Sequence, residues 1–482
     1  MFTVRGYLHR MELRRAIGGT TAVEALGPEG WRALEPPRGR LHRRFYVPIP
    51  GKFILALAVA IAWTTFSVWL SLRWVQDLAA VTNQAFALIA IGFIAYVPGF
   101  MNAFLLSTLL FDRRPPRVRA ASYPAVSILV AAYNEAAAIR DTLTSLARQD
   151  YAGRYEVLIL NDGSTDDTVA VVRNTLRDLR IRANATFRVL DFTVNAGKAA
   201  VLNRGFAVAQ HDLIITIDGD SWVRTDGLTQ IVERLLGDPS DTQAVAGAIM
   251  VRNSRENFLT RAQEWDYFHG IAAVKRMQSM YHGTLVAQGA FSLYRRGALE
   301  AVGGWPECVG EDIVLSWALL KAGHRIGYAE DAMAFTNVPT RLKQFALQRK
   351  RWSRGLVEAF RAHGALLFHR RLTTIFIWWN LMFLPLDLVY TFIFIPGLIL
   401  ALFGIYYIAG PLTLAVLPLA ALWNIFIFSI QRQMFRREGL KVRRNFGGFL
   451  FYALGYSLLM QPVCVWGYVT ELLGMRKTWD TK

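Results

Sequence analysis

Long apolar runs flank a middle part of the chain in which the apolar runs are short. Residues 53–72 and 82–111 contain no charged side chain, and residues 373–430 and 446–470 are almost wholly apolar. About twenty consecutive apolar residues are enough for an α-helix to cross a bilayer. The pattern therefore predicts a transmembrane hairpin before the middle part and transmembrane helices after it.

The middle part, residues 120 to about 340, alternates short apolar runs with helical patterns. Runs of strand length such as "VSILVA", "YEVLIL" and "DLIITI" are separated by amphipathic stretches such as "AIRDTLTSLARQ". Strands that alternate with helices are typical of a parallel sheet flanked by helices. We therefore expect an α/β domain of Rossmann-like type, inserted between membrane segments.

Basic side chains gather at both ends of the predicted hairpin. Arg43, Arg44 and Lys52 precede it, and Arg113 and Arg114 follow it. Because cytoplasmic loops carry an excess of Lys and Arg, the α/β domain is predicted to be cytoplasmic. Five spans would leave the C-terminus outside, although the final residues are basic. The last apolar run is therefore either a span or a re-entrant or surface helix.

These patterns divide the chain into five predicted parts. They are a basic N-terminal cytoplasmic segment (1–52), a transmembrane hairpin (53–111), the α/β domain (120–340), a part with interfacial helices (341–372) and C-terminal transmembrane helices (373–475).

The one feature of the composition that adds to this prediction is the net charge of the chain. The chain of 482 residues is 53% hydrophobic and has a formal net charge of +18. Such a charge indicates either nucleic-acid binding or membrane-flanking charge together with an anionic substrate. The basic residues flank the apolar runs and form no single stripe, which favours the second interpretation. Of the two cysteines, Cys308 lies in the middle part and Cys464 in a membrane run, so a disulfide is not expected.

Polar side chains follow four of the predicted strands, at the point where each strand ends. In a parallel sheet these ends meet at one edge, where ligands bind. The residues are Tyr133, Asn134 and Glu135 after the first strand, Asn161 to Ser164 after the second, Asn195, Gly197 and Lys198 after the third, and Asp218 and Asp220 after the fourth. Their convergence favours a binding site over four unrelated turns.

The chemistry of these residues fits a nucleoside diphosphate. Asp220, and with it Asp218, is expected to bind Mg²⁺ or Mn²⁺, because such ions take one or two carboxylates together with phosphate oxygens; Asp218 alternatively binds the ribose. Lys198, at a helix start, suits a phosphate, while Asp162 and Tyr133 suit a nucleobase. The alternatives are an acidic turn, an Asx-turn and a solvated lysine.

Two further groups of residues point to the chemistry of transfer. Glu311 and Asp312 precede an amphipathic helix and are either N-capping residues or a general base for a sugar hydroxyl. Gln348, Arg351 and Trp352 share one face of a helix. That helix either lies on the membrane surface or closes the site, with Trp352 against the acceptor sugar.

The ordered set of motifs resembles the membrane-embedded family 2 glycosyltransferases, which include the cellulose, hyaluronan, chitin and poly-N-acetylglucosamine synthases. The motifs are "YNE" (133–135), "DGS" (162–164), D-x-D (218–220), "GED" (310–312) and Q-x-x-R-W (348–352). The resemblance implies a cytoplasmic GT-A domain between membrane helices. It implies that Tyr133, Glu135 and Asp162 contact uridine, that Lys198, Asp218 and Asp220 hold the UDP–metal unit, and that Asp312 is the base.

Within that family the segment 310–355 looks closest to the poly-β-1,6-N-acetylglucosamine synthases, although Gly310 stands where those enzymes usually have Thr. The resemblance implies a processive, inverting transfer from a UDP-sugar to a growing polysaccharide, with extrusion through a bacterial inner membrane and a small membrane subunit as a further candidate partner. The alternatives are transfer of a single sugar to a lipid-linked acceptor and, in another class, a nucleotide-gated transporter. Nucleic acid is not an expected partner.

Overall fold

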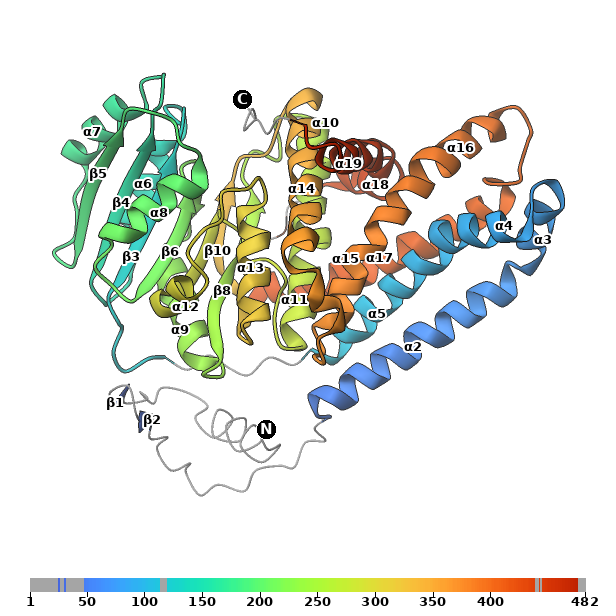
Figure 1. The fold of residues 1–482 in the computed structure, drawn as a ribbon, viewed down its shortest axis with the longest axis horizontal. Helices are drawn as coiled ribbons and strands as arrows, with labels where there is room; N and C mark the ends of the chain where they lie inside the picture. Colours follow the sequence, from blue (N-terminus) through green and yellow to red (C-terminus); the bar gives the residue numbers. More distant parts are fainter. Residues whose placement is uncertain are drawn as a thin grey trace.

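The computed structural model describes residues 47–112, 119–437 and 444–475, together with 25–26, 30–31 and 442. A sheet domain lies at one side of the molecule and a group of long apolar helices at the other, with α14 (Leu342–His363) between them (Figure 1). Most of the basic residues expected before the hairpin, and Arg113 and Arg114 after it, lie outside the described residues. The short strands β1 (Ala25–Leu26) and β2 (Gly30–Trp31) pair with each other.

The sheet has eight strands in the order β5-β4-β3-β6-β9-β8-β10-β7. The strands are β3 (Val126–Ala132), β4 (Tyr155–Asp162), β5 (Ala185–Phe192), β6 (Leu213–Asp218), β7 (Trp222–Val223), β8 (Thr242–Val251), β9 (Phe291–Arg295) and β10 (Arg325–Thr336). Neighbours among β3 to β6 are parallel, as are β8 and β10. The expectation of a wholly parallel sheet is wrong at β9 and β7, which run antiparallel to their neighbours.

The central strands are apolar because helices cover both faces of the sheet. Every residue of β4 is buried, and in β3 all but one are, as is typical of strands inside an α/β domain. The covering helices are α6 (Ile139–Ala147), α7 (Thr168–Asp178), α8 (Lys198–Val208), α9 (Gly227–Gly237), α12 (Arg296–Ala301) and α13 (Glu311–Lys321). Between β8 and β9 the chain makes α10 (Phe258–Trp265), a π-helical stretch (Asp266–Ala273) and α11 (Val274–Met280).

The predicted membrane part is mainly helical among its described residues, with short non-helical connections such as 403–410. Its helices are α2 (Ile49–Leu70), α3 (Leu72–Val81), α4 (Gln84–Ile91), α5 (Val97–Phe111), α15 (Thr374–Val389), α16 (Ile395–Leu402), α17 (Pro411–Arg437), α18 (Phe446–Leu454) and α19 (Tyr456–Leu472). Two π-helical stretches, Gly92–Tyr96 and Tyr390–Phe394, continue α4 into α5 and α15 into α16, and a 3₁₀ turn (Gly364–Phe368) follows α14.

Three continuous helices within the described ranges are long and apolar enough to cross a membrane. They are Ile49–Leu70, Gln84–Phe111 and Thr374–Leu402. The helices α18 and α19 pass the same test only as a pair bent by 51°, which is the geometry of a broken span or a re-entrant loop. Both interpretations of the last apolar run therefore keep a structural basis.

The helix α14 joins the sheet domain to the membrane helices. On one side it packs against α13, and on the other it lies along α19 (Figure 1). Buried ion pairs and hydrogen bonds connect α14 to α19: Arg354 Nε lies 2.9 Å from Glu471 Oε2, and Arg349 donates to Tyr456 Oη at 2.9 Å. The orientation of the Q-x-x-R-W helix is therefore set from both sides.

Candidate active site

The D-x-D segment is a tight turn fixed by its neighbours. The strand β6 ends at Asp218, and the Gly219 amide donates to the Ala131 carbonyl at 3.0 Å. The Thr142 hydroxyl donates to the Gly219 carbonyl at 2.8 Å. A Cβ at Gly219 would lie 3.0 Å from both the Ala131 oxygen and Cγ of Glu135, so a side chain at this position would need a small shift of its neighbours. The two aspartates thus lie on either side of a glycine in a tightly packed turn.

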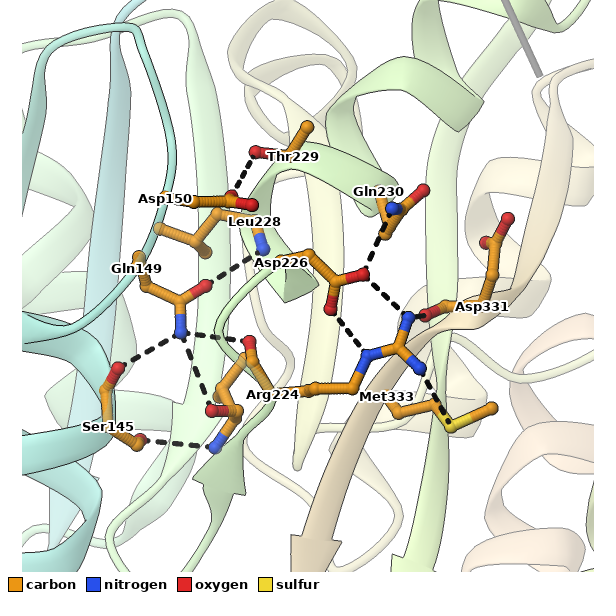
Figure 2. A network of polar contacts seen from close by, with 11 residues as sticks. Ser145, Gln149, Asp150, Arg224, Asp226, Leu228, Thr229, Gln230, Asp331 and Met333 are labelled. Atoms are coloured by element: carbon orange, nitrogen blue, oxygen red, sulfur yellow. Dashed lines mark hydrogen bonds and ion pairs between the residues drawn. The ribbon is translucent and has the colours of Figure 1, made fainter. Parts of the chain in front are cut away.

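A polar network fixes the chain just beyond this turn (Figure 2). Gln149, at the end of α6, donates to the carbonyls of Ser145 and Arg224, both at 3.0 Å, and accepts from the Leu228 amide at 3.1 Å. The Arg224 guanidinium forms an ion pair with Asp226. These bonds tie the segment that follows Asp220 to α6 and α9, so the D-x-D turn rests on a rigid support.

Lys198 lies at the centre of the carboxylate cluster. It is the first residue of α8, after Gly197 with φ of 90°. Its Nζ lies 2.5 Å from Asp218 Oδ1 and 3.6 Å from Glu311 Oε1, which joins β6, α8 and α13. A Cβ at Gly289 would lie 2.5 Å from the same Nζ, so glycine there leaves the space that the ammonium group occupies.

Burial and charge act on these groups in opposite directions. Burial lowers the pKa of Lys198, but Asp218 and Glu311 outweigh it, so that the pKa is raised and the ammonium stays charged. Burial raises the pKa of Glu311 from 4.5 to about 7, while Lys198 lowers it and Asp312 raises it further. Glu311 therefore changes charge near neutral pH, in the range where a carboxyl group can exchange protons with a reacting group.

Asp162 is buried beneath the loop that leads to Lys198. Its two carboxylate oxygens accept hydrogen bonds from the amides of Ala196 at 2.8 Å and Gly197 at 2.9 Å. Only 3% of the residue is exposed. Asp162 thus orders the start of α8, a role that sequence reasoning missed because its partners lie more than thirty residues away. Contact with a nucleobase stays a prediction.

The loops after β3 and β4 are bonded to each other. Asn134 adopts a positive φ of 54° and donates its amide to Ser164 Oγ at 3.0 Å. Its side-chain oxygen accepts from the Thr165 amide at 2.8 Å, and the Glu135 amide donates to Thr168 Oγ1 at 2.8 Å. Tyr133 is 44% exposed beside these bonds, and its contact with a nucleobase stays a prediction.

Glu311 and Asp312 lie in the first turn of α13 and not at its cap. The N-cap residue is Gly310, and no side chain of its own caps the helix. Glu311 is 5% exposed, whereas Asp312 is partly exposed and its Oδ1 accepts from the Ile313 amide at 2.7 Å. The alternative of N-capping by either carboxylate is therefore wrong, and Asp312 is the more accessible of the two.

The Q-x-x-R-W face of α14 approaches the same cluster. The positive charge of Arg351 lowers the pKa of Glu311, and Trp352 is 41% exposed with the Arg349 guanidinium 3.9 Å from its ring centre. Gln348 Oε1 is buried, without a hydrogen-bond partner among the described residues. The basic helix is thus turned toward the sheet domain, as the interpretation of a closing element predicts.

Tyr267 connects the two halves of the site and was missed from the sequence. It is buried, its ring centre lies 6.4 Å from that of Trp352, and burial raises its pKa to about 12, with Asp220 among the charges that act on it. Asp220 itself accepts from Thr336 Oγ1 at 3.2 Å. The sequence "EWDYFHG" does not indicate a site residue at Tyr267, because it is the helical segment after β8 that brings this tyrosine near Asp220.

The donor set fits a divalent cation held jointly with a substrate. Within residues 47–112, 119–437 and 444–475 no group of three or more His, Cys, Asp and Glu side chains is placed to hold a metal ion. Asp218 and Asp220 offer two carboxylates one residue apart, and Mg²⁺ sites commonly use one or two carboxylates together with substrate phosphates and water. These residues would need a diphosphate to complete the coordination.

A cavity of about 400 Å³ lies beside the site but outside the carboxylate cluster. Its lining residues are Trp222, Met250, Val251, Arg252, Ser254, Glu264, Trp265, Phe268, Phe335, Phe435 and Val442. None of the predicted site residues lines it, so the site is defined by the converging side chains and not by this cavity.

The sequence of the sheet domain matches a known family. Residues 127–303 match glycosyl transferase family 2. They form a family 2 glycosyltransferase domain. The match covers the motifs from "YNE" to the D-x-D turn and ends just before Gly310, so the "GED" and Q-x-x-R-W motifs lie beyond it.

Two curated relatives extend the similarity past that domain. The poly-β-1,6-N-acetyl-D-glucosamine synthase of Staphylococcus aureus (strain COL) is 30% identical over 274 residues, which are 55% of this chain and 64% of the relative. The synthase of the same name from Staphylococcus epidermidis is 32% identical over 231 residues, or 48% and 54% of the two chains. The matched part thus spans less than two thirds of the length of either relative.

A solved structure shares the fold. A mannosyltransferase from Pyrobaculum calidifontis, determined in complex with GDP-Man and Mn²⁺, superposes with a TM-score of 0.52 at 20% identity, covering 82% of this chain and 99% of that one. The prediction of a GT-A-like α/β domain flanked by apolar helices is therefore confirmed.

Proposed function

We propose that this protein is a membrane-bound glycosyltransferase that transfers N-acetylglucosamine from a UDP-sugar to a growing polysaccharide. The observation that carries the proposal is the cluster of Lys198, Asp218 and Glu311, assembled from three elements, with Arg351 of α14 near enough to act on Glu311. The similarity to poly-β-1,6-N-acetyl-D-glucosamine synthases supports the choice of sugar. The apolar helices support a location in a membrane, which we propose to be a bacterial inner membrane with the domain on its cytoplasmic side.

In this proposal the protein's own residues divide the work of one displacement. Lys198 and Arg351 hold the diphosphate, while Tyr133 packs against the base. Asp312 accepts the proton of the acceptor hydroxyl as that oxygen attacks the anomeric carbon from the face opposite the diphosphate. The bond from the anomeric carbon to the phosphate oxygen breaks, UDP leaves with the electron pair, and the configuration inverts.

A divalent cation would be held by Asp220 and Asp218 together with the diphosphate. When bound, it supplies positive charge that stabilises the leaving group. Trp352, with one ring face taken by Arg349, would offer its other face to the acceptor sugar. Repeated transfer, with passage of the chain between the membrane helices and the help of a small membrane subunit, completes the proposal.

The test uses the full chain in lipid nanodiscs with UDP-N-acetylglucosamine and Mg²⁺. We expect continuous release of UDP and a product that a β-1,6-N-acetylglucosaminidase degrades. Release of one UDP per lipid acceptor, with a single added sugar, would overturn processive synthesis. Nucleotide binding without any sugar transfer, across a panel of UDP-sugars, would overturn the enzyme and favour the transporter.

A further inference from the structure

The start of α13 rests directly on α14 at a contact between two glycines. A Cβ at Gly310 would lie 2.4 Å from the Cα of Gly355, and a Cβ at Gly355 would lie 2.8 Å from the Cα of Gly310. Both distances are shorter than real Cβ contacts, and the opposing atoms are backbone, which cannot move aside as a side chain can. The two helices therefore touch through their main chains at this point.

Glu358 completes the contact from α14. It lies one turn beyond Gly355 and is buried, with 7% of its surface exposed. Its Oε2 accepts from the Gly310 amide at 2.8 Å, and its Oε1 accepts from the Val309 amide at 3.3 Å. The first amides of a helix lack partners within the helix and favour negative charge. A carboxylate of another helix thus takes the place of a local cap on α13.

The residues that follow this contact are the predicted catalytic acids. Glu311 and Asp312 come directly after Gly310 in α13. The helix α14, which contacts Gly310, also carries Arg351 and Trp352. The position of the proton acceptor relative to the acceptor-sugar platform is thus set by one short contact between α13 and α14. The donor residues Asp218 and Lys198 come from the sheet edge, and Lys198 meets the start of α13 through its 3.6 Å ion pair with Glu311.

We propose that Glu358, together with the Gly310–Gly355 contact, is a positioning element that sets the place of Asp312 above the sugar site. The inference rests on the proposed function and goes beyond it, since Glu358 belongs to none of the motifs. It also gives a reason for Gly310, which stands where the resembling synthases usually have Thr. In this chain a Cβ there would force α13 away from α14.

Variants at Glu358 test the role of the carboxylate. In Glu358→Leu the hydrogen bonds from the Val309 and Gly310 amides are lost. We expect kcat for UDP release to fall about ten- to a hundredfold, because displacement of a catalytic group by about 1 Å has effects of that size. In Glu358→Gln one oxygen of the same shape still accepts, and most of kcat should return. The affinity for UDP, measured by calorimetry, should change less than kcat in both variants, because Asp218 and Lys198 keep their places on the sheet and only the ion pair of Lys198 with Glu311 is disturbed.

Glu156→Leu is the matched control for simple loss of a buried carboxylate. Glu156 is 2% exposed and accepts from the Gln210 amide at 2.6 Å, but it lies at the opposite end of β4 from the site. We expect a drop in thermal stability without the drop in kcat. If the two glutamates lower kcat equally for an equal loss of stability, Glu358 has only a structural role and the inference is wrong.

Variants at the Gly310–Gly355 contact provide a second, independent test of the inference. Gly310→Ala should lower kcat by more than it changes the affinity for UDP, whereas Gly297→Ala, where nothing lies within 4 Å of the added Cβ, should leave both unchanged. Hydrogen exchange should be faster at the Gly310 amide in Glu358→Leu and unchanged in β4. If the parent protein releases UDP and the variants Glu358→Leu and Gly310→Ala have the same kcat, this inference alone is overturned. A parent that releases no UDP from any sugar donor would overturn the proposed function as well.

Discussion

Replacement of Lys198 by Met removes the only ammonium group that contacts both Asp218 and Glu311 among the described side chains. The substitution keeps the length and much of the apolar volume of the side chain, so the loss is mainly that of charge. In the free protein Lys198 is the largest influence that lowers the pKa of Glu311, which is about 7. Without the ammonium group that pKa rises further, and Glu311 becomes neutral at pH 7.

The size of the effect follows from the contacts that the ammonium group would make with a diphosphate. Its Nζ now lies 2.5 Å from Asp218 and 3.6 Å from Glu311, and only 20% of the side chain is exposed. A hydrogen bond to a charged group contributes about 1.5–3 kcal/mol. Since about 1.4 kcal/mol corresponds to a factor of ten, the KM for the UDP-sugar should rise about ten- to a hundredfold.

The assay is continuous UDP release at varied donor concentration, with the thermal unfolding of each variant measured in parallel. Lys321→Met, an exposed lysine at the far end of α13, is the matched control and should behave like the parent. Gly289→Ala places a Cβ 2.5 Å from Nζ and should displace the ammonium group, with a smaller rise in KM. A Lys198→Met variant with the donor KM of the parent would refute the assignment of Lys198 to the diphosphate.

Three further substitutions test the other roles. Asp312→Asn should lower kcat at least a hundredfold while UDP binding by calorimetry stays within twofold, because only the proton acceptor is lost; retained turnover would contradict the assignment. Asp220→Asn should abolish the Mg²⁺-dependent part of UDP binding, and equal binding with and without EDTA in the parent would contradict a metal role. Glu311 is neutral below its pKa of about 7 and charged above it, where it competes with phosphate for Lys198. The donor KM should therefore rise between about pH 6 and pH 8 in the parent and stay flat in Glu311→Gln; a parallel rise in both would exclude Glu311 as the cause.

The sequence predicted the edge at which the site lies because parallel strands end together. Asp218 and Lys198 come from two different strand ends, and they lie 2.5 Å apart. The rule about strand ends predicts which residues lie close together, but it does not predict which of their atoms form hydrogen bonds or ion pairs. Asp162 satisfies the rule, yet its carboxylate is turned to the amides of Ala196 and Gly197. The choice between a ligand and a neighbouring loop depends on loop geometry, which residue types alone do not fix.

The antiparallel strand β9 and the role of Tyr267 could not be predicted, for one physical reason. Both depend on the insertion of α10 and α11 between β8 and β9, which replaces the usual helical crossover of a parallel pair. Most of β9 is buried between β6 and β8. Periodicity gives an element's type, but its direction in the sheet follows from the path of the chain before it.

The structural role of the basic residues on α14 could not be predicted from composition. A basic helix just before an apolar run is also typical of a helix on the membrane surface, yet Arg349 and Arg354 are 1% and 4% exposed. Arg349 lies 2.8 Å from Asp266 and bonds to Tyr456, while Arg354 lies 2.9 Å from Glu471. Removal of one partner from such a buried pair destabilises strongly, by about 3–5 kcal/mol, because the other charge is left unpaired.

Arg349 and Arg354 therefore hold α14 against its neighbours. The α19 side is fixed by Arg349 and Arg354, and the α13 side by Glu358 and the contact of Gly355 with Gly310. Trp352 lies on the same helix, between Arg349 and Arg354 in the sequence. A displacement of α19 relative to the sheet domain is therefore expected to reach Trp352 and the start of α13 through α14. Under the proposed function, α14 thus links the apolar helices to the residues that bind the acceptor sugar and accept its proton.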